Sequence, residues 1–394
     1  MNKSVTHLLL LFLFLGNVTC YQGPKKVIID LSADTNKPLE FKKDLKPIFS
    51  KKFSDNKNCF HEIYKNDLYL TSIDDKYIDA KYSNRLFLRK TDLDGNEKWV
   101  FIIDQFSKVS LKDILPTDNG VYILFEGYTG NIARDCFLKK LDNNGNELWT
   151  KNFGKNYRTG HLDIMKLDVN GHLLFVLNKN QASVLYRTSS KGTVLDKVSF
   201  SEKSELSITD FEFDKKGNIM LIGHITSYPD KKLMQEAFFY KLDNKFNVLQ
   251  KKVQLFGRST LPNDIALLDS GKFAVKISSD INFNLPPEKQ IVPLYFLLDN
   301  DLNISNISQI PSIRVGDRTI FKFISADQVI AFDKTYLNKS SCYVFHTFDG
   351  KMNYQKSTLI KFNTGIIDAS ILDDGQVLVN KHEEEMIRLN IDFK

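Results

Sequence analysis

The chain has 394 residues, a net charge of +6 and 42% apolar residues. This apolar fraction excludes a disordered chain. Basic and acidic residues are interspersed along the sequence. This excludes the concentrated basic surface that nucleic-acid binding requires.

The N-terminus predicts a secretion signal. Lys3 supplies a positive charge, and residues 8–15 form an apolar run that is shorter than the roughly 20 residues of a membrane-spanning helix. Cys20 follows this run and resembles the acylated cysteine of bacterial lipoprotein signals, although Asn17 and Thr19 depart from that motif. We therefore expect residues 1–20 to be a lipoprotein-like signal peptide, with ordinary cleavage near Cys20 and free secretion as the alternative.

This leader predicts where the protein resides. We expect export across the inner membrane and a lipid anchor at Cys20 in the bacterial cell envelope, and otherwise an extracellular or periplasmic product. The anchor would be the protein's contact with the membrane. Cys59, Cys136 and Cys342 are far apart and show no Cys-x-x-Cys spacing, so we expect buried thiols and no zinc site.

Residues 87–99 and 137–149 are copies of one another and align without a gap. The first reads Phe-Leu-Arg-Lys-Thr-Asp-Leu-Asp-Gly-Asn-Glu-Lys-Trp, and the second reads Phe-Leu-Lys-Lys-Leu-Asp-Asn-Asn-Gly-Asn-Glu-Leu-Trp. Each copy is typical of a strand, a tight turn and a second strand, which together form a hairpin. Weaker copies begin at Leu185, Phe239, Phe296 and Val344.

A second hairpin precedes each copy, with turns such as Asn119–Gly120 and Asn170–Gly171. Seven units of about 50 residues follow one another, each with four short strands that we name A to D. No sustained 3.6-residue apolar pattern occurs, which argues against folds that alternate strands with helices. The sequence therefore predicts an all-β fold, a seven-bladed β-propeller of four-stranded antiparallel blades, with six or eight blades as the alternative.

The seventh unit ends after three strands, which we expect near residues 366–371, 377–379 and 386–391. Residues 45–53 resemble the D strands of other units and can supply the missing fourth strand. Closing the ring in this way removes free sheet edges. We therefore expect the propeller to span residues 45–394, and residues 21–44 to be a tether or to contain a short extra strand at residues 27–31.

The units resemble a family of secreted or lipid-anchored bacterial β-propeller repeats with the consensus Lys-Leu-Asp-x-x-Gly-Asn-x-x-Trp-x-Lys-x-Phe-Gly. The match is specific over Lys140–Gly154 and looser over the rest of the mature chain. The units also share an Asp-x-x-Gly-x-x-x-Trp segment with quinone-dehydrogenase propellers, but the tryptophan occurs here only at Trp99 and Trp149. The resemblance implies a propeller fold, an envelope location and a binding role.

An aspartate recurs near the start of strand A in most units. Because A strands line the axis of a propeller, these carboxylates could meet at the channel mouth and hold a cation. The alternative, which recurrence with the repeat favours, is that each carboxylate accepts backbone N–H groups and fastens its blade to the next. The channel-mouth carboxylates are Asp113, Asp163, Asp210, Asp264 and Asp368.

The connections between strands B and C are long in units one, four and five, at residues 72–84, 223–236 and 278–293. They share one face with the D-to-A connections, which we call the long-loop face. Function usually resides in such loops, and Tyr and Arg suit recognition; the alternative is simple drift in loop length. The candidate binding residues are Tyr77, Tyr82, Tyr128, Arg134, Tyr228, Lys231, Lys232, Phe283 and Tyr336.

The sequence contains no P-loop, no His-Glu-x-x-His and no Gly-x-Ser-x-Gly motif. We therefore expect no catalytic residues, no cofactor and no metal. The expected function is that of a monomeric, non-enzymatic recognition or scaffold protein, which binds an unknown protein or glycan on the long-loop face. The alternative is a carbohydrate-active, glycosidase-like enzyme or a quinone-dependent one.

Overall fold

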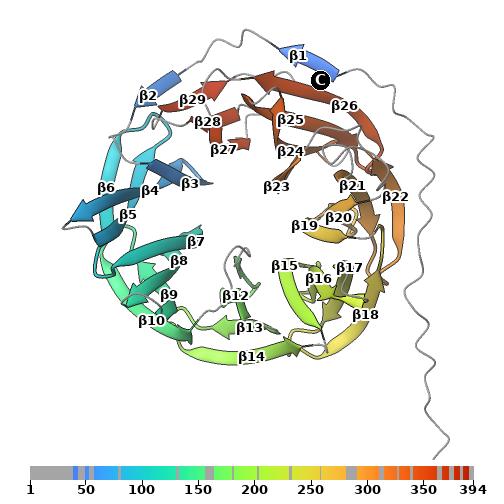
Figure 1. Cartoon of the computed structure of the whole chain (residues 1–394), viewed down its shortest axis with the longest axis horizontal. Helices are drawn as coiled ribbons and strands as arrows, with labels where there is room; N and C mark the ends of the chain where they lie inside the picture. The colour runs from blue at the N-terminus through green and yellow to red at the C-terminus, as the bar shows by residue number, and fades with distance from the viewer. Residues whose placement is uncertain are drawn as a thin grey trace, which may run out of the picture.

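Strands account for most of the described chain, as the alternating apolar pattern predicts. The computed structural model describes residues 39–42, 49–52, 57–78, 81–129, 133–155, 164–179, 182–201, 204–229, 233–257, 259–280, 291–309, 315–325, 328–337, 340–361, 366–371, 377–381 and 385–389. Within these ranges the strands form seven sheets arranged in a ring (Figure 1). The predicted all-β propeller is confirmed, and the seven sheets are compatible with the seven blades expected. None of the described residues belongs to a helix with the length and apolarity to cross a membrane.

The first five blades each contain four strands that follow one another in the chain, from the axis to the rim. Blade 1 contains β3 (Lys57–Tyr64), β4 (Asp67–Ile78), β5 (Lys81–Asp92) and β6 (Glu97–Ile103). Blade 2 contains β7 (Lys108–Thr117), β8 (Gly120–Thr129), β9 (Ala133–Leu141) and β10 (Glu147–Lys155). Blade 3 contains β11 (Met165–Leu167), β12 (Leu173–Lys179), β13 (Ala182–Thr188) and β14 (Val194–Ser201).

The later blades repeat this order. Blade 4 contains β15 (Glu205–Phe213), β16 (Ile219–Ser227), β17 (Met234–Leu242) and β18 (Val248–Gln254). Blade 5 contains β19 (Thr260–Leu267), β20 (Phe273–Asp280), β21 (Ile291–Leu298) and β22 (Ile304–Gln309). Blade 6 contains β23 (Val315–Ser325), β24 (Gln328–Leu337), β25 (Ser340–Asp349) and β26 (Tyr354–Lys361). Blade 7 contains β27 (Ile366–Ile371), β28 (Val377–Lys381) and β29 (Glu385–Leu389).

The N-terminal part of the chain completes the ring. β2 (Phe49–Lys52) pairs antiparallel with β29 and supplies the fourth strand of blade 7, as predicted. The segment expected as a tether contains a strand that we did not predict, β1 (Leu39–Lys42), which pairs in parallel with β26 as a fifth strand of blade 6. Both lie at the rim in Figure 1. The extra strand expected at residues 27–31 lies outside the described residues, as does Cys20.

The apolar core lies between blades. Phe239 on β17 of blade 4 packs in one cluster with Phe273, Val275 and Phe296 of blade 5, and similar clusters join the preceding and following blades. In blade 3 the middle strand β12 is covered on both faces and buried along almost its whole length, whereas the rim strand β14 alternates. Removing a buried Phe from such a core costs about 3–5 kcal/mol.

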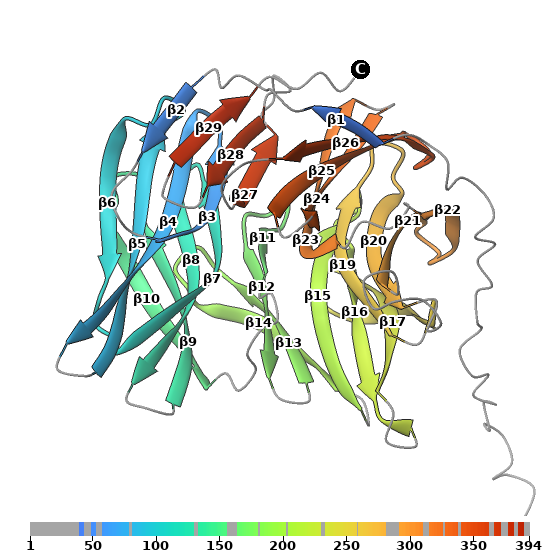
Figure 2. The same cartoon turned by 45° about the horizontal axis from the view of Figure 1, so that its top comes forward.

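The two faces of the ring differ in their connections. The A–B and C–D turns are short and lie together on one face, which we call the tight-turn face. The B–C connections lie on the long-loop face, and the hairpin ends of β8–β9, β12–β13 and β16–β17 project from the lower side of Figure 2.

Candidate functional site

The A-strand aspartates link adjacent blades. Asp113 Oδ2 accepts a hydrogen bond from the backbone N–H of Met165 (2.8 Å), at the start of the next A strand. Asp210 Oδ2 accepts one from the backbone N–H of Ile265 (3.0 Å) in the same way. A register irregularity directly precedes both aspartates, and a bulge of this kind re-aims a side chain out of the regular pleat. In this structure both carboxylates therefore link adjacent blades through hydrogen bonds.

Asp264 belongs to a buried charge cluster near the axis. Burial and the neighbouring carboxylate of Asp210 raise the pKa of Asp264 well above its usual value. Lys166 Nζ lies 3.4 Å from Asp210 Oδ1 and 3.0 Å from Glu212 Oε2. Burial lowers the pKa of Lys166, but these two carboxylates outweigh it and hold that pKa above its ordinary value. The cluster thus joins blades 3, 4 and 5.

Asp163 lies outside the described residues. Asp368 lies on β27, opposite Asn380 of β28, and its side chain is outside the described set.

Three of the predicted binding residues on the long-loop face have described side chains. Tyr128 and Arg134 lie opposite each other in the β8–β9 register, and the guanidinium carbon is 5.2 Å from the tyrosine ring centre. Arg134 also lies 4.0 Å from Glu126. Tyr228 is 62% exposed, in blade 4. The structure therefore brings Tyr128 and Arg134 together, with Tyr228 two blades further around the ring. The side chains of the remaining candidates lie outside the described set: Tyr77, Tyr82, Lys231, Lys232, Phe283 and Tyr336.

The tight-turn face is built from one repeated C–D turn. Asp142 Oδ1 accepts hydrogen bonds from the backbone N–H groups of Asn144 (2.9 Å) and Asn146 (2.8 Å), and its Oδ2 accepts one from the Asn146 amide (2.9 Å). The Asn146 amide lowers the pKa of Asp142. The fourth residue, Gly145, has a φ of 83°, in the left-handed region that favours glycine. The same network surrounds Asp92, Asp243, Asp299 and Asp349.

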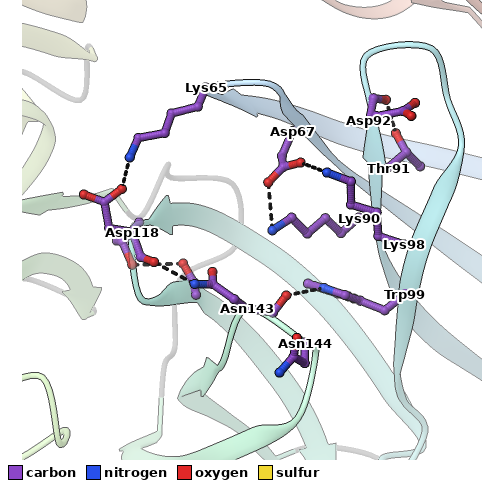
Figure 3. A network of polar contacts seen from close by, with 12 residues as sticks. Lys65, Asp67, Lys90, Thr91, Asp92, Lys98, Trp99, Asp118, Asn143 and Asn144 are labelled. Atoms are coloured by element: carbon purple, nitrogen blue, oxygen red, sulfur yellow. Dashed lines mark hydrogen bonds and ion pairs between the residues drawn. The ribbon is translucent and has the colours of Figure 1, made fainter.

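We call the contact between two adjacent blades on the tight-turn face a joint. In the joint between blades 1 and 2, a tryptophan fills the space. Trp99 of blade 1 donates from Nε1 to the carbonyl of Asn143 in the C–D turn of blade 2 (2.9 Å; Figure 3). A Cβ atom on Gly145 would lie 2.8 Å from the indole. Trp149 repeats the arrangement one blade further, where Nε1 donates to the carbonyl of Ser190 (3.0 Å). The glycine of the turn therefore makes room for the ring of the preceding blade.

Polar contacts close the joint between blades 1 and 2 nearer the axis. Lys65 pairs with Asp118 across this joint, and Asn143 Nδ2 donates to the carbonyl of Asp118 (2.7 Å; Figure 3). Lys90 Nζ binds Asp67 within blade 1 (2.8 Å). The tips of these two blades are thus connected by both an aromatic ring and charged groups.

In the joints between blades 3 and 4, 4 and 5, and 5 and 6, the C–D turn of the following blade supplies the bulky side chain. The fourth turn residue there is bulky, buried and left-handed, with φ between 60° and 66°. These residues are Phe246, Leu302 and Met352. The preceding rim strands carry smaller polar residues at the position of the tryptophan, namely Asp196, Gln250 and Asn306. Each of these joints therefore contains one bulky side chain, contributed either by the rim strand or by the next turn.

A pocket of about 290 Å³ opens on the tight-turn face at the joint between blades 3 and 4. Asp196 and Asn244 line it, at the positions that Trp149 and Ser190 hold in the preceding joint. A carboxylate has no N–H to donate to the turn, and Asp196 instead accepts a hydrogen bond from the backbone N–H of Lys197 (2.8 Å). The pocket thus lies beside Asp196, at the position that carries a tryptophan in the preceding joint.

Arg187 supplies the buried cation of this pocket. Its side chain is 14% exposed, its Nε lies 3.5 Å from Asp168 Oδ2, and its Cζ lies 4.4 Å from the Phe246 ring centre. Asp168 itself accepts the backbone N–H of His172 (2.9 Å). The apolar part of the wall consists of Val169, Leu195 and Phe213. A cation beside apolar walls suits a ligand that carries an anionic group next to an apolar one.

This pocket was not predicted from the sequence. The sequence signal for the pocket is a pair of positions in successive repeats. Asp196 stands at the tryptophan position of one repeat, and Phe246 is the fourth turn residue of the next. Among the described side chains, no group of three or more His, Cys, Asp or Glu residues is arranged to hold a metal ion.

Neither a protein-family model nor a curated protein matches the chain. Solved structures do resemble it. An ulvan lyase from a new family of polysaccharide lyases is 10% identical, with 86% of this chain and 95% of that chain covered and a TM-score of 0.55. The β-propeller domain of the trilobed protease from Pyrococcus furiosus is 12% identical, with 86% and 95% covered and a TM-score of 0.51. At these identities the likeness concerns the fold, and both structures support a β-propeller.

Proposed function

We propose that this chain is a recognition protein of the cell envelope, which binds a macromolecular partner on the tight-turn face of blades 2–4 without transforming it. The observation that carries the proposal is the pocket between blades 3 and 4 together with the apolar side chains at the same end of neighbouring blades. These side chains are between 44% and 81% exposed. They are Leu148, Val169, Val194, Leu195, Val248 and Leu249. Val169 and Leu195 line the pocket itself, and exposed apolar groups beside a pocket are typical of interaction sites.

Binding is favoured over catalysis because the described axial carboxylates have structural partners. Asp113 and Asp210 each accept a backbone N–H from the next blade. The rival function is a carbohydrate-active or quinone-dependent enzyme, for which the Asp210–Asp264 pair would be the acid–base candidate. Release of products from ulvan or another polysaccharide, lost in an Asp264→Asn variant that still folds, would support the rival.

The location forms part of the proposal. A lipid anchor at Cys20 would hold the propeller at the envelope, where either face could meet a partner. The long-loop face, with Tyr128, Arg134 and Tyr228, stays the alternative binding surface.

Face-specific variants test the proposal. The purified chain is incubated with a solubilised envelope extract and with a glycan array, and bound material is compared among variants. We expect Val169→Asp and Leu195→Asp to abolish capture, because each places a charge on an exposed apolar site, whereas Tyr228→Ala should bind normally. Both aspartate variants alter exposed positions, so their melting temperatures should stay unchanged. Normal capture by both, with loss in Tyr228→Ala, would move the site to the long-loop face.

A further inference from the structure

Three other blades carry a lysine at the position of Arg187. Lys90, Lys140 and Lys241 stand at the equivalent place in their C strands. Each binds an oxygen of the protein, at 2.8–3.1 Å. Arg187 Nε, by contrast, is buried and has no hydrogen-bond acceptor within the described part of the chain. Its ion pair with Asp168 is long, at 3.5 Å.

Asp168 is already committed to its own turn. Its Oδ1 accepts the backbone N–H groups of Asn170 (2.8 Å) and His172 (2.9 Å), and its Oδ2, which faces Arg187, lies 3.3 Å from His172 Nδ1. An arginine fork is complementary to a carboxylate, which can accept two parallel N–H groups. The guanidinium at this pocket is therefore suited to a second carboxylate, supplied by a ligand.

The surroundings of the pocket favour an acidic polypeptide over a glycan. Lys216 lines the pocket, and it is one of four exposed lysines in the turns of blades 3 and 4 that attract negative charge. They are Lys191, Lys215, Lys216 and Lys245. The exposed rim beside Arg187 is aliphatic, with Val169 and Leu195. It therefore matches the aliphatic side chain of a peptide, whereas the face of a sugar ring packs best on an aromatic platform.

We infer that this pocket binds an acidic polypeptide segment, with an aspartate or glutamate carboxylate against Arg187 and the neighbouring aliphatic side chain between Val169 and Leu195. The inference deepens the proposed function and rests on it. It identifies the partner as a protein, and the contact as a short acidic segment with an embedded apolar residue.

The test uses a fluorescein-labelled peptide, Gly-Ser-Glu-Glu-Asp-Leu-Glu-Glu-Ser-Gly, and the full mature chain, with binding followed by fluorescence polarisation. We expect saturable binding that weakens as salt rises. A peptide with Gln and Asn in place of Glu and Asp, and one with Ser in place of Leu, should each bind at least tenfold more weakly. Arg187→Gln should cause a similar loss, and Tyr228→Ala on the other face should cause none.

Because Arg187→Gln also removes the contacts of Arg187 with Asp168 and Phe246, a second variant tests the pocket with Arg187 unchanged. Asp196→Trp with Phe246→Gly rebuilds the arrangement that Trp149 forms in the preceding joint, and the indole should fill the pocket. We expect this variant to lose peptide binding while its melting temperature is retained or raised. Undiminished peptide binding by this double variant, or equal binding of the acidic and amide peptides, would overturn the inference.

The outcome separates the inference from the proposed function. If the acidic peptide does not bind, but Leu195→Asp still abolishes capture of the extract partner, the acidic-segment inference fails and the proposed face stands. If Leu195→Asp also captures normally, both fail.

Discussion

Lys140 is expected to destabilise the folded protein at neutral pH, and Lys140→Met should therefore stabilise it. The Lys140 side chain is almost fully buried, with Nζ 3.0 Å from Thr117 Oγ1 and 3.7 Å from the Tyr122 ring centre. Blades 3 and 4 carry Asp168 and Asp214 at the position of Thr117, where each faces the corresponding cation. Lys140 thus meets a hydroxyl where these blades provide a carboxylate, and burial lowers its pKa to about 8.

The size of the effect follows from this pKa. A fall from 10.5 to about 8 corresponds to about 3 kcal/mol of penalty for the charged form at 1.36 kcal/mol per unit. Because the unfolded chain keeps its proton up to the higher pKa, the penalty is complete below pH 8. It is relieved as the pH rises from about 8 to 10.5. The cation–π contact with Tyr122 reduces the penalty somewhat.

Urea unfolding at pH 7 and pH 10 measures how much the charged Lys140 lowers the stability of the folded protein. We expect Lys140→Met to be more stable than wild type by about 1–3 kcal/mol at pH 7, and this difference to shrink markedly at pH 10. Lys90→Met is the matched control, because Lys90 holds the equivalent position but binds Asp67 at 2.8 Å. That variant should lose about 1–3 kcal/mol. If Lys140→Met is destabilised at pH 7 as much as Lys90→Met, the reasoning is wrong.

Three further predictions concern the joints, the closure and the anchor. Gly192→Ala should lower the free energy of unfolding by about 1–3 kcal/mol more than Gly171→Ala, as measured by denaturant unfolding. Both glycines have φ near 75°, but a Cβ atom would meet Trp149 only at Gly192. Equal losses would contradict the proposed packing. Deleting residues 45–53 removes the strand paired with β29 and should cost several kcal/mol, so an unchanged melting temperature would refute the role of this strand in closure. Cys20→Ala should release the protein from the membrane fraction on cell fractionation, and persistent membrane association would exclude the lipid anchor.

The regular part of the fold was predictable because it depends on local pattern. Period-2 alternation and Asp/Asn/Gly turns mark strands and hairpins, and the expected strand at residues 366–371 coincides with β27. The closing strand was predictable because residues 45–53 resemble the other D strands. β1 was not predictable, because its parallel partner, β26, lies at the far end of the chain and a four-residue strand carries little signal of its own.

The candidate site was harder to predict, because it arises from a difference between repeats. The copies at residues 87–99 and 137–149 were recognised by what they share, whereas the pocket lies where Asp196 departs from the tryptophan of those copies. The consequence depends on Phe246, which belongs to the next repeat and meets Arg187 only in the folded ring. Loop length pointed instead to the long-loop face, for which Tyr128, Arg134 and Tyr228 stay predictions.

Site-specific photocrosslinking in cells tests the central claim most directly. A photoreactive amino acid replaces Leu195 beside the pocket in one strain and Tyr228 on the opposite face in another, and both side chains are exposed, at 50% and 62%. From the proposed function we expect a discrete crosslinked protein from position 195 and none from position 228, with the adduct lost when Asp196→Trp and Phe246→Gly are added. A crosslink that forms only from position 228 would contradict it.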